Sequence, residues 1–148
     1  MSDASGTPGG DLEGLFAASL AGGEIRSPRA SLVLVEWRDP GGGGDPPVYI
    51  APLHVHHQDD EASYVLEGTL KVRVGVDDVK VGAGGAVLVP RGTPHTYWNP
   101  DPTPTRCVLV MTPPIRRLID AIHGLTERDQ ETLEATFREH SSEYLGWP

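Results

Sequence analysis

Short runs of apolar and β-branched residues, punctuated by glycine and proline, limit this chain to a small set of folds. Seven such runs follow one another between Val48 and Met111: VYIAPLHVH, SYVLEG, TLKVRVGV, VKVGAGG, AVLVP, HTYWN and RCVLVMT. Their spacing is typical of a barrel or sandwich. In the third run apolar Leu70 alternates with charged Lys71, so one face of that strand should meet a core. The 18 glycines and 14 prolines among 148 residues imply many tight turns, and the pattern predicts an all-β body.

The length of 148 residues predicts a single domain with appended segments. The first residues are small and polar, and we expect residues 1–25 to form a partly disordered N-terminal arm. The β-barrel should occupy residues 26–113. Residues 114–148 should form C-terminal helices, because the spacing of apolar residues changes to the helical period there.

Two helices are expected in this C-terminal part. The first should begin after Thr112, with proline in its first turn and an apolar stripe formed by Ile115, Leu118, Ile119 and Ile122. The second should begin at Thr126, because Thr126 and Asp129 are spaced like a capping box.

The chain is acidic, with a formal net charge of −9 and a sequence pI near 5.0. This charge argues against nucleic-acid and anionic-membrane partners, both of which select clustered lysine and arginine. No run approaches the roughly 20 apolar residues of a spanning helix. Asp3, Asp11 and Glu13 stand where a signal peptide carries positive charge. We therefore expect a soluble, cytoplasmic protein.

Three of the six histidines could form a metal site. His54 and His56 are two residues apart on an expected strand, so their side chains point to the same face. Glu61 follows after a short loop, and His95 lies further along the chain. Imidazole and carboxylate are ligands for Zn, Mn, Fe, Ni or Cu, whereas the single Cys107 excludes a multi-cysteine site. The alternative, three buried histidines without a metal, is costly unless something neutralises them.

Two motifs at these residues resemble those of the cupin family. The first motif is HxH, four residues, Glu, six residues and Gly, and it is met by His54, His56, Glu61 and Gly68. The second is Gly, five residues, PxG, two residues, His, three residues and Asn, and it is met by Gly84, Pro90, Gly92, His95 and Asn99. The resemblance covers roughly residues 30–112. Val48 departs from it, because the family often has glycine at that place before the first histidine.

The resemblance implies a double-stranded β-helix, or jelly-roll barrel, here with a short C-terminal helical tail. It also implies one divalent transition metal per chain (Fe, Mn, Ni, Zn or Cu), held by His54, His56, Glu61 and His95. Strand parity places Ser63 with Glu61 and Tyr97 with His95, so Ser63 and Tyr97 are the predicted ligand-binding side chains.

The leading functional hypothesis is a metal-dependent, dioxygenase-like enzyme that acts on a small organic molecule. Glu61 would leave the metal and act as the catalytic base toward a substrate hydroxyl, because a carboxylate released into a partly dry pocket has a raised pKa. A metal-dependent isomerase or decarboxylase is an alternative, and so is a small-molecule-binding cupin without catalysis.

We also expect a homodimer. The apolar strand SLVLVEW at residues 31–37 and the helical stripe of the first C-terminal helix offer more hydrophobic surface than one barrel needs.

Overall fold

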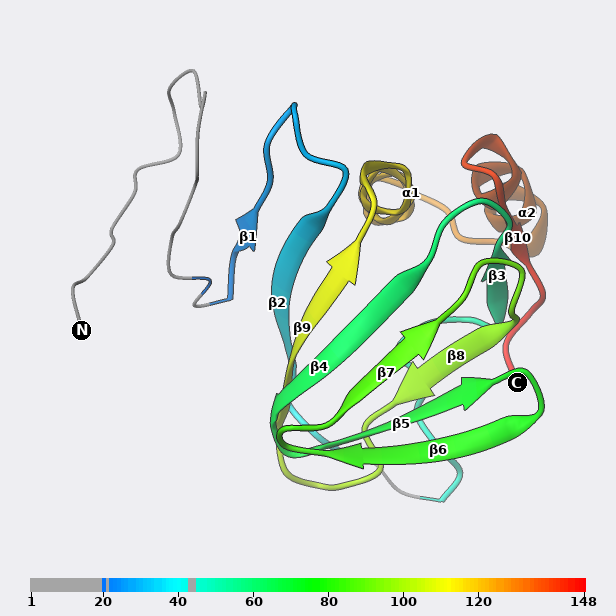
Figure 1. The fold of residues 1–148 in the computed structure, drawn as a ribbon. Helices are drawn as coiled ribbons and strands as arrows, with labels where there is room; N and C mark the ends of the chain where they lie inside the picture. The colour runs from blue at the N-terminus through cyan, green and yellow to red at the C-terminus, as the bar shows by residue number, and fades with distance from the viewer. Residues whose placement is uncertain (1–19, 21, 43–44) are drawn as a thin grey trace.

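Two antiparallel sheets of five strands each form the body of the chain (Figure 1). The computed structural model describes residues 20, 22–42 and 45–148. The first sheet has the order β1-β2-β9-β4-β7. Its strands are β1 (Glu24–Ile25), β2 (Val33–Asp39), β9 (Thr105–Met111), β4 (Glu61–Glu67) and β7 (Ala86–Val89). The second has the order β10-β3-β8-β5-β6. Its strands are β10 (Ser142–Tyr144), β3 (His54–His56), β8 (His95–Trp98), β5 (Thr69–Val74) and β6 (Asp77–Gly82).

The expected jelly-roll class is confirmed: the chain is mostly β, with two helices after the last long strand. Most of the arm expected at residues 1–25 lies outside the described residues. Only residues 20 and 22–25 of this arm are described. Among the latter, β1 pairs with β2, so the sheet begins before the expected start of the barrel. The limits of the three predicted segments remain predictions.

The space between the sheets is filled by alternate residues of the central strands. Along β9 every second side chain is buried, including Cys107 and Met111, whereas their neighbours are half-buried. Cys107 packs with Leu70 and Val72 of the opposite sheet. Gly68 lets β4 turn into β5 at this end, because it has a φ of 78° and an added Cβ would lie 2.4 Å from the carbonyl oxygen of Pro104.

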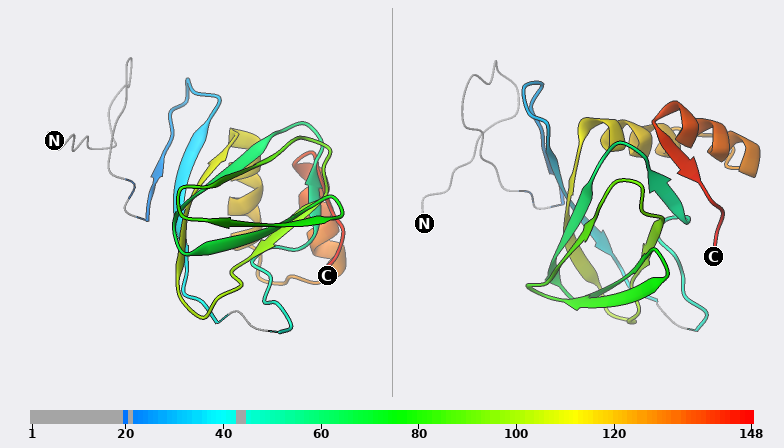
Figure 2. Two further views of the ribbon diagram at one scale, coloured as in Figure 1. Left: turned by 60° about the horizontal axis from the view of Figure 1, so that its bottom comes forward. Right: turned by 45° about the vertical axis from the view of Figure 1, so that its right-hand side comes forward.

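Both helices lie at one end of the two sheets (Figure 2). α1 (Pro113–His123) begins after Thr112, as predicted, with proline at its first positions. α2 (Gln130–Glu139) begins four residues later than Thr126. The capping-box prediction is wrong, since Asp129 is the N-cap and its Oδ1 accepts a hydrogen bond from the backbone N–H of Thr132 at 2.9 Å.

The C-terminal strand β10 has no counterpart in the sequence analysis. It pairs with β3, so that Ser142 lies opposite His56 and Tyr144 opposite His54. In the described part of the chain, no helix has both the length and the apolar character needed to cross a membrane.

Candidate metal centre

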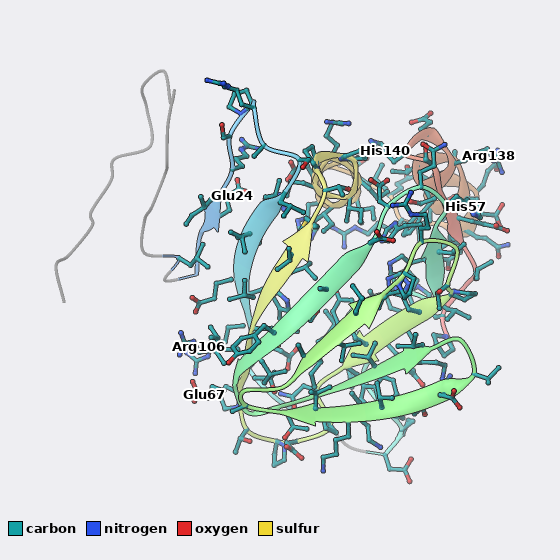
Figure 3. The ribbon with its side chains drawn as sticks, viewed as in Figure 1. Glu24, His57, Glu67, Arg106, Arg138 and His140 are labelled. Carbon is teal, nitrogen blue, oxygen red and sulfur yellow. The ribbon has the colours of Figure 1, made fainter. Side chains whose placement is uncertain are left out.

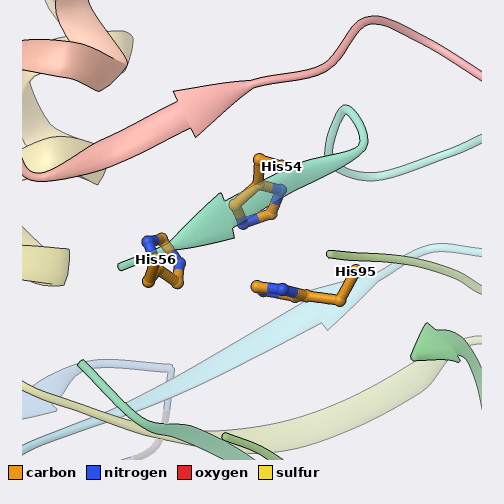
Figure 4. Close-up of side chains that lie close together, drawn as sticks. All are labelled: His54, His56 and His95. Atoms are coloured by element: carbon orange, nitrogen blue, oxygen red, sulfur yellow. The ribbon is translucent and has the colours of Figure 1, made fainter. Parts of the chain in front are cut away.

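Three imidazole rings meet between the two sheets (Figure 4). His54 and His56 come from the same face of β3, and His95 begins β8, directly opposite His54 in the strand register. The ring centroid of His54 lies 4.2 Å from that of His95 and 4.9 Å from that of His56. One ring nitrogen from each of the three residues lies within 4.8 Å of the others, and all three side chains are buried. The cluster can therefore hold a metal ion.

Glu61 reaches the same point from the other sheet. It is the first residue of β4, and its carboxylate is buried. Its Oε2 lies 3.1 Å from His56 Nε2 and 4.0 Å from His95 Nε2. The four residues singled out in the sequence thus surround one small volume.

Hydrogen bonds at the outer ring nitrogens determine where the protons lie. His54 Nδ1 is 2.7 Å from the carbonyl oxygen of Pro52, and His95 Nδ1 is 3.0 Å from that of Thr93. A carbonyl oxygen only accepts, so both Nδ1 atoms must donate. In the neutral rings the lone pairs then lie on Nε2, the atom that faces the cluster. His95 Nε2 is buried and has no hydrogen-bond partner among the described residues.

Burial keeps these rings neutral. It lowers the pKa of His54 to about 3, and the neighbouring His95 and His56 contribute to the same shift. Burial also lowers the pKa of His95. A metal binds the neutral imidazole, so both rings are already in the binding form at neutral pH.

The pKa of the Glu61 carboxylate is set by burial and by the neighbouring imidazoles. Burial alone would raise its pKa, but the hydrogen bond that a protonated His56 Nε2 donates and the positive charge of a protonated His95 or His56 outweigh burial and lower the pKa. This lowered pKa belongs to Glu61 beside the imidazoles, and the raised pKa expected once the carboxylate has left a metal stays a prediction. The ionised carboxylate of Glu61 and the buried Nε2 lone pair of His95 are both electron-pair donors. A divalent cation bound between them would offset the cost of burying both groups.

A mostly apolar cavity of about 270 Å³ adjoins His54, His56 and Glu61. Its walls come from both sheets, from Phe137 of α2 and from the apolar stripe of α1, which consists of Ile115, Leu118, Ile119 and Ile122. The stripe that the sequence analysis assigned to a dimer surface therefore faces the interior of the chain. Sequence periodicity revealed the apolar face of α1 but not what that face covers.

The two predicted ligand-binding residues differ in position. Tyr97 lines the cavity, and burial raises the pKa of its phenol. Ser63 is half-buried and does not belong to the lining. His123, at the end of α1, is a lining residue that the sequence analysis did not single out. Ligand contact by Ser63 or Tyr97 remains a prediction.

His57 lies outside the centre although it follows His56 directly. Its side chain is 52% exposed, and its Nε2 lies 3.3 Å from Glu143. Figure 3 shows it at the surface near Arg138 and His140. Strand alternation explains this position, because consecutive residues point to opposite faces.

Comparison with known proteins gives one family match and several similar folds. The family profile of the cupin domain matches residues 39–111. The protein TT1209 from Thermus thermophilus is 26% identical, with a TM-score of 0.50 over 61% of this chain and 81% of that one. No curated protein matches the chain.

Two similar structures of named enzymes share less with this chain. A sugar phosphate isomerase from Silicibacter pomeroyi is 21% identical, with a TM-score of 0.48 over 56% of this chain and 51% of that one. The DMSP lyase DddQ from Ruegeria pomeroyi is 25% identical, with a TM-score of 0.45 over 55% of this chain and 38% of that one. The match to the isomerase spans about half of that protein's length.

Proposed function

The chain carries a cupin domain, and from this premise we propose that it is a metal-dependent enzyme, dioxygenase-like, that acts on a small organic molecule. One observation carries the proposal. The Nε2 of His95, which has no hydrogen-bond partner in the described part of the chain, lies 4.0 Å from the carboxylate of Glu61 in a buried cluster that adjoins an apolar cavity. Such a donor set next to a substrate-sized space supports catalysis at a metal more than a purely structural role.

The proposed ligands are His54, His56, His95 and Glu61. A divalent transition metal bound there would supply a Lewis acid with open positions for substrate or dioxygen. Glu61 carries the lone pair that would accept a proton from a substrate hydroxyl. Its lowered pKa makes it a weak base while it stays beside the imidazoles, so this role requires that substrate binding draw it away from them.

The cavity suggests the kind of substrate. Its walls are largely aliphatic and would exclude water around an apolar molecule. Because burial raises its pKa, the Tyr97 phenol keeps its proton and can donate it to an oxygen of the ligand. We propose Ser63 as a weaker, second contact, since it follows Glu61 on the same face of β4.

Oxygen uptake tests the proposal. The untagged protein is loaded anaerobically with Fe(II) and then assayed against flavonols, diketones and thiols. Uptake with at least one of these classes, abolished in Glu61→Ala, is the expected result. Binding of a candidate with neither uptake nor turnover would instead indicate a small-molecule-binding cupin. Turnover without oxygen would indicate an isomerase or decarboxylase.

We also propose that the chain forms a homodimer. Exposed apolar side chains remain at Leu32, next to β2, and at Leu88 of β7. Light scattering after size exclusion should give about 32 kDa, twice the chain mass of 15.9 kDa. A mass near 16 kDa at micromolar concentration would contradict the dimer.

A further inference from the structure

The orientation of His56 depends on a strand outside the matched domain. β10 follows α2, well beyond residue 111, where the family match ends. It lies directly beside β3, the strand that carries His54 and His56. Backbone hydrogen bonds hold the two together, from His57 N–H to the Ser141 carbonyl at 3.0 Å and from Leu145 N–H to the Leu53 carbonyl at 2.8 Å.

The other two imidazoles are oriented locally. His54 and His95 each donate Nδ1–H to the carbonyl oxygen of the residue two positions earlier, Pro52 and Thr93 respectively. His56 has no such local acceptor among the hydrogen bonds of the described residues. Its Nδ1 lies 2.7 Å from the hydroxyl oxygen of Ser142, 86 residues further along the chain.

The hydroxyl of Ser142 is arranged to accept. Ser142 is buried, with 6% of its surface exposed, and its Oγ lies 3.2 Å from the carbonyl oxygen of His140. That carbonyl accepts the hydroxyl proton, so a lone pair of Oγ remains for His56 Nδ1–H. An imidazole that binds a metal through Nε2 must carry its proton on Nδ1, and in a buried place that proton needs an acceptor.

We propose that Ser142 is a positioning residue of the metal centre, which fixes His56 with Nε2 toward the metal. This inference rests on the metal site proposed above. The C-terminal strand is then part of the centre rather than an appendage. The packing of the same segment supports this role, because Tyr144 contacts Phe137, whose ring lies 5.5 Å from that of His54.

Zn(II) affinity tests the proposal without any assay of activity. Competition with a chromogenic chelator should show Ser142→Ala binding Zn(II) about 10- to 100-fold more weakly than the unmodified chain. Ser142→Thr keeps the hydroxyl and should restore the affinity to within about threefold. Glu143→Ala is the matched control, since its side chain lies on the exposed side of the same strand and should leave the affinity unchanged.

A spectroscopic signature separates positioning from a general loss of structure. In the Zn(II)-loaded protein, the Nδ1 proton of His56 should give a slowly exchanging resonance that Ser142→Ala loses and Ser142→Thr keeps. Unchanged resonance and affinity in Ser142→Ala would overturn the role of Ser142 alone. Failure of the unmodified chain to bind Zn(II) would instead overturn the metal site itself.

Discussion

His95→Ala should leave the purified protein with less than about a tenth of a metal ion per chain, whereas the unmodified protein should hold close to one. Loss of an outer hydrogen-bond partner typically costs 10- to 100-fold in metal affinity, and loss of a direct ligand should cost more. His95 is also the residue whose Nε2 has no other partner in the described structure. Elemental analysis of protein purified without a polyhistidine tag measures the effect.

His57→Ala is the matched control for this substitution. His57 adjoins a proposed ligand in the sequence but points to solvent, so its removal should leave the metal content unchanged. Circular dichroism of both variants shows whether the fold persists. Near-stoichiometric metal in a folded His95→Ala protein would contradict the proposed site.

The metal-free protein should lose about 2 kcal/mol of unfolding free energy between pH 7 and pH 5 through His54 alone. The pKa of this ring is about 3 in the folded chain, whereas an unperturbed histidine, as in the unfolded chain, has a pKa of 6.5. In the window between these values the unfolded chain binds more protons, so stability is highest above pH 6.5 and falls as the pH drops toward 3. His95 acts in the same direction, because burial lowers its pKa too.

Urea unfolding after dialysis against a chelator, at pH 7, 6 and 5, measures this dependence. His54→Gln should flatten the slope whatever it does to the stability at pH 7, and His57→Ala should leave the slope unchanged. A stability of the unmodified protein that is constant from pH 7 to pH 5 would refute the assignment of a buried neutral His54.

Local sequence patterns were sufficient to predict those parts of the fold in which buried and exposed residues alternate regularly. Alternation at Leu70 and Lys71 predicted a half-buried strand, and β5 is that strand. The separation of His54 and His56 by one residue placed both rings on one face, as the structure has them. The resemblance to cupins placed Glu61 with the three histidines, but its approach from the opposite sheet was not predicted, because spacing alone does not say which strands face each other.

Other features depend on contacts that no local pattern records. β10 has only three residues, too few for a period, and it exists because β3 offers it an edge. The start of α2 was misplaced because Thr126 and Asp129 are both acceptable N-cap residue types, and in the structure it is the side chain of Asp129 that caps the helix. The contact of Ser142 with His56 likewise joins residues that are far apart in the sequence, so no local period could have indicated it.

The pairing of distant strands has a kinetic consequence. Val33 pairs with Met111 in one sheet, and His56 pairs with Ser142 in the other. Each sheet therefore joins residues that are far apart in the sequence. Contacts at such separations form slowly, and refolding should take milliseconds to seconds rather than microseconds. A nascent polypeptide should therefore acquire its full complement of oriented imidazoles only after Ser142 has left the ribosome and docked.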